Sequence, residues 1–331
     1  MSLTSTLNSG VSALSAFSEG IQVLSNNIAN VNTTAFKGSR SEYSDSFSNI
    51  LRQAAPAPSS GNGSNTPGTQ IGTGVQVASV TANHNQGTLS STGKNTDMAV
   101  SGAGFFRVRD VANNVDYVTR AGDFRLDSSG YLVTSEGFRV QGLSDGAATY
   151  VATSNGATPP VLQFAQTATA PSAVGDIRID FNISVGSGIT NSTGGAFTDA
   201  QVNVGKPTFR SFTVSESGEV IIGLSNGDKV TRGQLLLQNF NDVSGLTKAG
   251  NNLYTGLAAA GPIGGTTLTA ANNTPGTSGL GKVEVGALEL SNVDLSKEMT
   301  DMIVIERSFQ AASRVVTVSD RMLEEIVNLK R

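Results

Sequence analysis

Apolar residues near the N-terminus recur with the period of a helix that packs along one seam. They are spaced alternately four and three residues apart, with Gly10 filling one position of the series: Leu3, Leu7, Leu14, Phe17, Ile21, Leu24, Ile28 and Val31. A period of about 3.5 residues over roughly four heptads is typical of coiled-coil helices. The pattern therefore predicts an N-terminal helix about 44 Å long, at about 1.5 Å per residue.

A second series with the same spacing lies near the C-terminus. Ala312 and Ser319 fill two of its positions, and the others carry larger apolar side chains: Met302, Ile305, Phe309, Val316, Leu323 and Ile326. This pattern predicts a C-terminal helix with a seam of its own.

The flanks of the C-terminal series carry helix-end signals. Ser291, Asn292 and Asp294 are candidate N-caps, and Ser291 to Asp294 resembles a capping box with Asp in place of Glu. Asp294 and Glu298 in the first turn, and the terminal Lys330-Arg331, suit the helix dipole.

Two arrangements of these helices are open. They could form one antiparallel hairpin within the chain, or pack against copies from other subunits. The N-terminal helix favours the second, because its off-seam positions are small and Glu19 is the only charge before Lys37. A solvated coiled coil normally carries Glu and Lys at its flanks. Since Ser, Thr, Asn and Gly are weak helix formers, we expect this helix to order only on assembly.

Between the helices the pattern changes to short strands separated by turns. Turn candidates are Asn113-Asn114, Ser128 to Gly130 and Ser135 to Gly137. Phe212 to Gly218 matches Phe124 to Gly130, which suggests a hairpin unit used twice. We therefore predict a multidomain α+β protein, in which long terminal heptad helices form a coiled-coil layer and the central domains are mainly β.

Changes in composition divide the chain into six expected parts. Stretches rich in Pro, Gly, Ser and Ala are assigned as connectors. In chain order the parts are an N-terminal axial helix and turn (1–40), an extended connector (41–75), a β-rich domain (76–145 with 206–255), an inserted β-rich domain (146–205), a second connector (256–285) and a C-terminal axial helix (286–331).

Composition excludes several kinds of chemistry. The 331 residues include no Cys, so disulfides, thiolate metal sites and cysteine nucleophiles are excluded. The net charge of −4 gives no general attraction to nucleic acid. The one histidine, His84, lies in a polar run and is interpreted as a solvated residue. Without metal-ligand spacing, a phosphate-binding loop or a nucleophile elbow, we predict no enzyme activity, cofactor or metal.

The first residues, MSLTSTLNSG, lack the basic start and the apolar core of a Sec signal peptide. No stretch approaches about 18 uninterrupted apolar residues, so we expect no insertion into a membrane.

Two classes of protein fit these patterns. An adhesin or other β-rich binding module would explain the β middle, but not the two heptad ends. The subunit of a helical filament explains both, because identical subunits that join head to tail without closing form helical polymers.

The stretch SNNIANVNTTAFKGSR, residues 25–40, interrupts the helical pattern with amides. Its marked residues are four asparagines followed by Phe-Lys: Asn26, Asn27, Asn30, Asn32, Phe36 and Lys37. The first three lie between seam positions near the helix end. Their amides are either solvated at a helix stop or meet backbone groups of neighbouring chains, and we prefer the second interpretation.

Three stretches together resemble the bacterial flagellar axial proteins, the family of rod and hook subunits. They are NNIANVNTTAFK at 26–37, the strand-rich residues 101–142 and the helical residues 286–329. The family usually has Gly before the Phe-Lys. Ala35 stands there in this chain, which argues against a left-handed backbone at this position.

Within the family, residues 291–298 and the region 146–205 resemble the hook subunit most, whereas 51–75 resembles a segment typical of the distal rod. We therefore expect a hook subunit, with the distal rod second.

The resemblance implies a subunit exported unfolded through the flagellar type III apparatus, without a Sec signal, to the extracellular flagellum. It implies a homopolymeric tube that meets neighbouring rod and junction proteins and the hook cap. A hook would be a flexible joint that transmits torque, and a rod would be a rigid drive shaft.

Overall fold

The computed structural model describes residues 3–54, 65–144, 150–154, 162–166, 173–179, 209–225 and 229–329. The chain divides into two compact units. Unit 1 comprises Met1–Thr33, Lys37–Asn85 and Ser291–Arg331, and unit 2 comprises Thr34–Phe36 and Gln86–Leu290. Unit 1 therefore gathers both ends of the chain, and unit 2 contains the middle.

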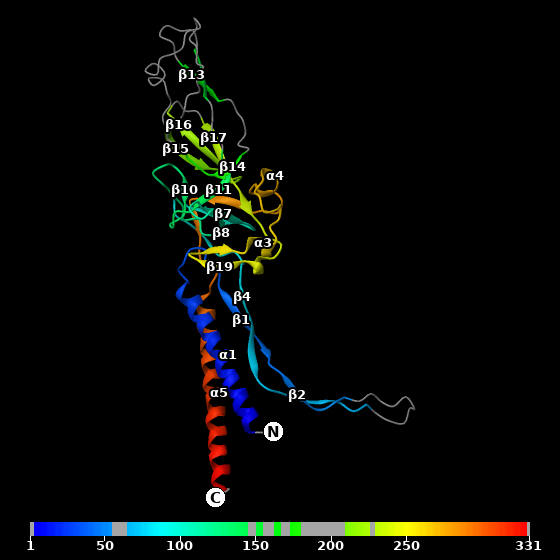
Figure 1. Ribbon diagram of the computed structural model, residues 1–331. Coiled ribbons are helices and arrows are strands. Elements are labelled where there is room, and N and C mark those ends of the chain that lie inside the picture. The colour runs from blue at the N-terminus through cyan, green and yellow to red at the C-terminus, as the bar shows by residue number, and fades with distance from the viewer. Residues whose placement is uncertain are drawn as a thin grey trace. The chain divides into compact units, whose positions relative to one another are not determined.

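Two long helices dominate unit 1, α1 (Leu3–Ala29) and α5 (Leu295–Leu329). They lie side by side and antiparallel, with the two chain ends at the same end of the pair (Figure 1). They approach each other closely at Gly10, where an added Cβ would come within 2.7 Å of Val316 Cγ2. Both predicted helices are thus confirmed, although α1 ends two residues before Val31.

Asp294, one of the three N-cap candidates predicted from the sequence, is the N-cap of α5. Its carboxylate accepts hydrogen bonds from the backbone N–H groups of Ser296 (2.9 Å) and Lys297 (3.3 Å). Ser291 precedes the helix and accepts a bond from Val293 N instead, so the predicted capping box at 291–294 is wrong. The capping role falls to Asp294 because its side chain reaches the N–H groups two and three residues further on.

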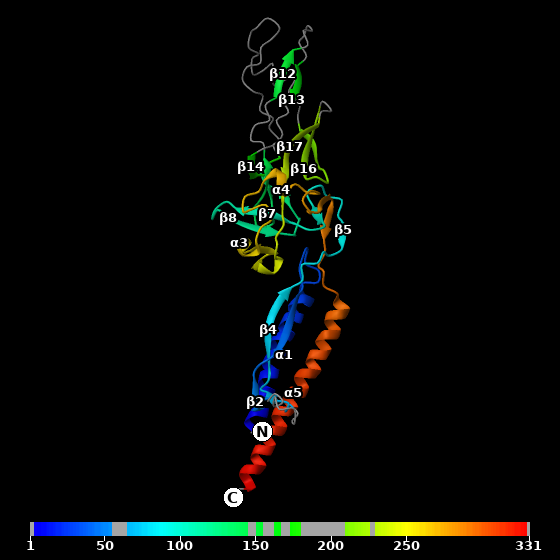
Figure 2. The ribbon, with the colours of Figure 1, turned by 90° about the vertical axis from the view of Figure 1, so that its right-hand side faces the viewer.

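Two antiparallel ribbons complete unit 1. β1 (Ser39–Asp45) pairs with β4 (Val75–Ala82), and β2 (Ser48–Arg52) pairs with β3 (Thr69–Gly72). The β1–β4 ribbon packs along α1 (Figure 2), where the Tyr43 and Phe17 rings meet edge to face with centroids 6.0 Å apart. The described part of the expected connector 41–75 therefore consists largely of paired strands, and β4 belongs to unit 1. Its alternating pattern predicts a strand but does not identify the strand's partner.

Unit 2 is built mainly on one antiparallel sheet, whose main path runs in the order β15-β16-β17-β11-β7-β8-β20-β19. Two separate antiparallel pairs, β21 with β6 and β22 with β5, are not hydrogen-bonded to this sheet among the described residues. The elements are β5 (Leu89–Ser91), β6 (Met98–Ser101), β7 (Phe105–Asp110), β8 (Val115–Thr119), β9 (Arg125–Leu126), β10 (Leu132–Val133), β11 (Arg139–Ser144), β12 (Tyr150–Ser154), β13 (Leu162–Gln166), β14 (Ala173–Asp176), β15 (Phe209–Val214), β16 (Glu219–Leu224), β17 (Lys229–Leu235), β18 (Leu237–Gln238), η1 (Val243–Gly245), β19 (Thr247–Gly250), β20 (Leu253–Thr255), α3 (Leu257–Ala260), α4 (Ala270–Asn273), β21 (Lys282–Val285) and β22 (Ala287–Glu289). The predicted α+β class, with terminal helices and a mainly β middle, is confirmed.

The core of unit 2 draws on distant parts of the sequence. Phe106 and Phe124 meet edge to face with ring centroids 5.1 Å apart, and Ile177 and Ile179 are buried in the same cluster. β14, just before these isoleucines, pairs with β11. Residues 173–179 thus join the main sheet, although the sequence pattern groups them with the expected insertion 146–205. Most of that region lies outside the described residues.

The predicted repetition of a hairpin is confirmed at the turns. Asp127 N donates to Tyr131 O (3.0 Å), and Ser215 N donates in the same way to Glu219 O (2.9 Å). Each turn carries a glycine with positive φ, 82° at Gly130 and 79° at Gly218. Only glycine adopts this conformation without steric cost, which explains why the two copies share it. The sequence also aligns Gly227 approximately with Gly137, but Gly227 lies outside the described residues.

The expected connector 256–285 packs on the sheet more than an extended linker would. Leu268 is buried, and so is Asn273, whose side chain donates to Leu237 O (2.8 Å) and accepts from Thr269 N (2.9 Å). A sequence rich in Gly and Thr indicates irregular backbone in this segment. It does not indicate that the buried amide of Asn273 anchors the segment to the sheet.

Gly142 should be essential to the sheet of unit 2. A Cβ at this position in β11 would overlap the Gln234 carbonyl oxygen of β17, a backbone atom that cannot move aside without shifting its strand. Gly142→Ala should lower the free energy of unfolding by about 2 kcal/mol or more, in the range of overpacked cores. Chemical denaturation monitored by tyrosine fluorescence measures this loss.

Gly72→Ala is the matched control, because no atom lies within 4 Å of a Cβ built there. If the two substitutions changed stability equally, the steric explanation for Gly142 would be wrong.

Candidate assembly surface

The predicted seams face each other within one chain. In α1, Leu24 is buried and the other described seam side chains are half-buried: Leu7, Leu14, Phe17, Ile21 and Ile28. The side chain of Leu3 lies outside the described residues. Val31 is half-buried in the turn after α1.

The α5 seam shows the same tendency. Ala312 and Ser319 are buried, and Met302, Ile305, Val316 and Leu323 are half-buried. Phe309 and Ile326 are more open, with 37% and 50% of their surfaces exposed. The chain thus adopts the first of the two arrangements that the sequence left open, an antiparallel hairpin of its own ends.

A second apolar series on α5 has no covering partner among the described residues. We call it the α5 stripe: Val304, Ser308, Ala311, Val315, Val318, Met322, Ile326 and Leu329. All are exposed except Ser308, which is half-buried. Six of the eight directly precede a seam residue, so the stripe lies about 100° around the helix from the seam. This series was not predicted from the sequence, although its spacing is again mostly four and three.

The remaining face of α5 is charged and exposed, with Glu306, Arg307, Arg314, Arg321 and Glu324. α5 therefore presents three faces, one against α1, one apolar and open, and one charged. An open apolar stripe of this length is a candidate contact surface, because soluble proteins rarely leave such stripes in water.

The outer side of α1 is also nearly uncharged. Val11 is 51% exposed, and the exposed Ser15, Ser18 and Gln22 surround the lone charge of Glu19. Small uncharged groups allow another helix to approach closely, so both helices of the hairpin offer surface to a neighbour.

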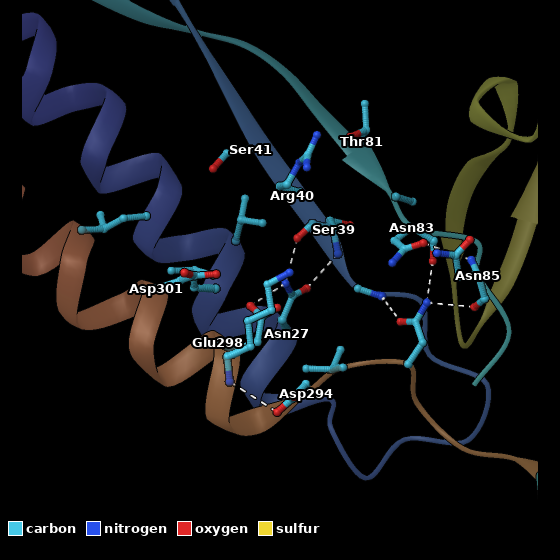
Figure 3. Close-up of a pocket in the computed structure, with 18 of the residues that line it drawn as sticks. Asn27, Ser39, Arg40, Ser41, Thr81, Asn83, Asn85, Asp294, Glu298 and Asp301 are labelled. Carbon is cyan, nitrogen blue, oxygen red and sulfur yellow. Dashed lines mark hydrogen bonds between the residues drawn. The ribbon is translucent and has the colours of Figure 1, made fainter. Parts of the chain in front are cut away.

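Asn27 organises the point where three elements of unit 1 meet. Its side-chain amide donates to Ser39 O (2.8 Å) and to Glu298 Oε2 (3.0 Å), while its oxygen accepts from Ser39 N (2.9 Å). Asn27 is only 1% exposed. It therefore joins the end of α1 to the start of β1 and the first turn of α5 (Figure 3).

The other asparagines of the motif act more locally. Asn30 Nδ2 donates to the backbone and side-chain oxygens of Asn26 (2.9 and 3.0 Å), and Thr33 donates to Asn30 Oδ1 (3.1 Å). Asn32 is exposed. The amides of Asn26, Asn27 and Asn30 thus bond within their own chain. Burial leaves Asn27 no surface for a neighbouring chain, whereas contact of Asn26 and Asn30 with neighbouring chains stays a prediction. The turn after α1 brings Ser39 back to Asn27. The local sequence pattern does not predict this contact.

The end of the motif is buried. Ala35 has φ 56° and donates its N–H to Glu289 O (2.8 Å), so the prediction against a left-handed backbone is wrong. An alanine in this region costs roughly 1–2 kcal/mol, which burial of the segment offsets. The Phe36 ring lies 4.6 Å from Lys248 Nζ, and burial lowers the pKa of Lys248. Lys37 is buried in unit 1, where Nζ donates to Asn85 O (2.7 Å).

A groove of about 710 Å³ opens beside Asn27, between the end of α1, the β1–β4 ribbon and the start of α5. Most of its lining residues are polar, and they carry both signs of charge: the cations Arg40 and Lys297 and the carboxylates Asp294, Glu298 and Asp301. The hydrogen bonds of Asn27 with Ser39 and Glu298 lie along this groove (Figure 3).

Further chemistry is not indicated in the described parts of the chain. Within them, no group of three or more Asp, Glu, His or Cys side chains is placed to hold a metal ion. His84 is half-buried, with both ring nitrogens shielded from solvent, so the expectation of a solvated histidine is wrong. None of the described helices has the length and apolar character needed to cross a membrane.

Known protein families match the chain in three places. Residues 7–37 match the family described as flagella basal body rod protein, and residues 99–222 match the flagellar hook protein FlgE/F/G D1 domain. Residues 284–329 match the flagellar basal body rod FlgEFG protein C-terminal family.

Individual proteins match over almost the whole chain. The flagellar basal-body rod protein FlgG of Bacillus subtilis (strain 168) is 35% identical over 325 residues, which cover 98% of each chain. The flagellar hook protein FlgE of Treponema pallidum (strain Nichols) is 26% identical over 470 residues, covering 98% of this chain and 99% of that protein. The crystal structure of the Helicobacter pylori flagellar hook protein FlgE2 aligns with 60% of this chain and 100% of that chain, with a TM-score of 0.37 and 10% identity.

The N-terminal helix with the asparagine motif, part of the strand-rich middle and the C-terminal helix each lie within a match to a flagellar family. This chain belongs to the flagellar axial family, the structural proteins of the basal-body rod and the hook.

Proposed function

We propose that this protein is a structural subunit of the flagellar rod, of the distal-rod type, which polymerises through its terminal helices into a helical tube. The observation that carries the proposal is the α5 stripe, which stays open after α1 and α5 have packed together. In this proposal the α5 seam holds the hairpin, and the stripe meets a second copy of the chain.

The proposed contact joins different surfaces of the two copies. The stripe of one copy packs against the uncharged outer side of α1 in the next, so the contact repeats head to tail and extends into a polymer. Burying the stripe yields about 25 cal/mol per Å² of apolar surface. Together the helices would form the coiled-coil layer of the tube.

Two features of the sequence matches support the rod over the hook. The rod protein of B. subtilis aligns with 98% of each chain over 325 residues. The alignment with the T. pallidum hook protein spans 470 residues, more than the 331 of this chain, so that protein contains segments without a counterpart here.

A hook subunit is the second candidate. The resemblance of 291–298 to hook proteins favours it, as does the hook-protein match over 98% of this chain. The partners of either subunit would be copies of itself, neighbouring axial proteins, a cap and the type III export apparatus, which would deliver the chain without a Sec signal. Family membership supports these partners and a location in the flagellum outside the cell membrane.

Substitutions in the α5 stripe should block polymerisation while leaving the hairpin folded. Val315→Glu places an unpaired charge in the proposed contact, which should raise the critical concentration for assembly at least about tenfold. Sedimentation and negative-stain imaging measure assembly, and circular dichroism measures helix content.

Arg314→Glu is the matched control, because it changes charge on the neighbouring charged face and should assemble far better than Val315→Glu. Tubes formed normally by Val315→Glu would exclude the stripe as the contact.

The form of the polymer should distinguish the two candidates. A rod subunit should give straight tubes, since a drive shaft must resist bending, whereas a hook subunit should give curved and polymorphic tubes. Electron microscopy of tubes assembled from purified protein measures their curvature, and curved tubes under all conditions would favour the hook.

The α1 helix should open locally more often in the dilute monomer than in the polymer, because its intrinsic propensity is weak. Amide hydrogen exchange at Leu14 should be fast in monomer and slow in assembled tubes. Strong protection at Leu14 in the monomer would show that α5 alone orders it.

A further inference from the structure

Unit 2 contains a cavity of about 270 Å³, which we call the α3 pocket. Four strands contribute lining residues, β7, β8, β18 and β20, and α3 with the loop after it contributes the rest. Since a water molecule occupies about 30 Å³ in the liquid, the α3 pocket is large enough for a small organic molecule. None of its lining residues belongs to the terminal helices of unit 1.

Hydrogen bonds to the sheet hold the loop wall of the α3 pocket in place. Asn241 N donates to Gly261 O (3.0 Å) where α3 ends. Further along the loop, Ile263 N donates to Asn239 O (2.9 Å), and Ile263 O accepts from the buried Gln238 Nε2 (3.0 Å). The cavity is therefore largely formed without a ligand, as small-molecule sites usually are.

Arg107 of β7 brings a guanidinium to the lining of the α3 pocket. The residue is only 9% exposed, and its Nη1 and Nη2 donate to Thr266 O (2.6 Å) and Asp116 Oδ2 (2.6 Å). Its Nε is shielded from solvent and has no hydrogen-bond partner in the described part of the chain. Because a guanidinium carries five N–H groups and a buried N–H without an acceptor is costly, Arg107 has unused capacity for an acceptor.

The charges around Arg107 leave an excess of one cation. Asp116 also accepts from Arg109 Nε (2.7 Å), so one carboxylate serves two guanidiniums. Arg139, opposite Arg109 on the neighbouring strand, pairs with Asp176 (2.9 Å), which gives three arginines and two aspartates in this network. Burial raises the pKa of Asp116, but hydrogen bonds from Arg109 and Arg107 lower it overall, so Asp116 stays ionised. One negative charge in the pocket would balance the network.

The helix side of the α3 pocket is uncharged and largely apolar. Leu257 and Ala258 of α3 line it together with Pro262 of the following loop. A ligand suited to both sides has an anionic end for Arg107 and a short hydrocarbon body. A carboxylate suits that end, because its two oxygens match the N–H groups of a guanidinium.

We propose that the α3 pocket binds a small aliphatic carboxylate. The carboxylate oxygens accept from the guanidinium of Arg107, and the hydrocarbon body packs against Leu257, Ala258 and Pro262. The inference concerns unit 2 alone and does not depend on the proposed function.

Saturation-transfer NMR on the full-length protein with butanoate tests the proposal. The method detects weak binding through the protons of the ligand, whether the protein is monomeric or polymerised. Butanoate should bind with a Kd on the order of 1 mM. Butanamide, which has the same shape without the charge, should bind at least about tenfold more weakly. Equal binding of the two compounds would overturn the proposal.

Two substitutions test the two sides of the pocket separately. Ala258→Phe should fill the cavity while Arg107 stays in place, and Arg107→Gln removes the cation. Each should weaken butanoate binding at least about tenfold, and circular dichroism checks that each variant is folded. Ala259→Phe is the matched control, because Ala259 is the next exposed residue of α3 and is not among the lining residues of the described chain. It should bind butanoate as the unaltered chain does. The proposal is overturned if folded Ala258→Phe or folded Arg107→Gln binds butanoate as tightly as the control.

Discussion

The antiparallel contact between α1 and α5 is the constraint on which unit 1 depends. It joins the two ends of the chain, and the close approach at Gly10 is possible only because no side chain stands there. Packing along one seam leaves the other faces of α5 open. The apolar stripe is therefore a consequence of the hairpin, since a helix with two apolar series can satisfy only one of them with a single partner.

The asparagine motif has a different role from the one that its position suggests. Amides are poor helix formers, and a row of them near a helix end is easily interpreted as surface for another molecule. In the folded chain Asn27 is buried and connects α1, β1 and α5, while Ala35 turns the chain into unit 2 in a strained conformation. The motif secures the start of the strand-rich middle against the helix hairpin from which it emerges.

Polar side chains, several of them buried, hold distant segments of this chain together. Asn27 and Asn292 do this in unit 1, and Glu289, Arg120 and Asn273 do it in unit 2. Each bonds to groups of another segment, most of them backbone groups, and a buried backbone group left unpaired is costly. A chain so rich in irregular segments needs such anchors, because loops contribute little apolar burial.

The two helices, the strand-rich middle and the repeated hairpin turns follow from the amino-acid sequence alone, and so does the family, which three stretches of sequence indicate. The structural elements rest on local period or on residues such as Gly130 and Gly218, whose backbone freedom is a property of the residue. Folding in three dimensions was needed to show that the seams meet within one chain, that β4 belongs with α1 and that residues 173–179 join the main sheet. It also decided which of two apolar series on α5 is covered. A regular spacing of apolar residues shows that one face of a helix is apolar. Which surface covers that face depends on contacts between residues hundreds of positions apart.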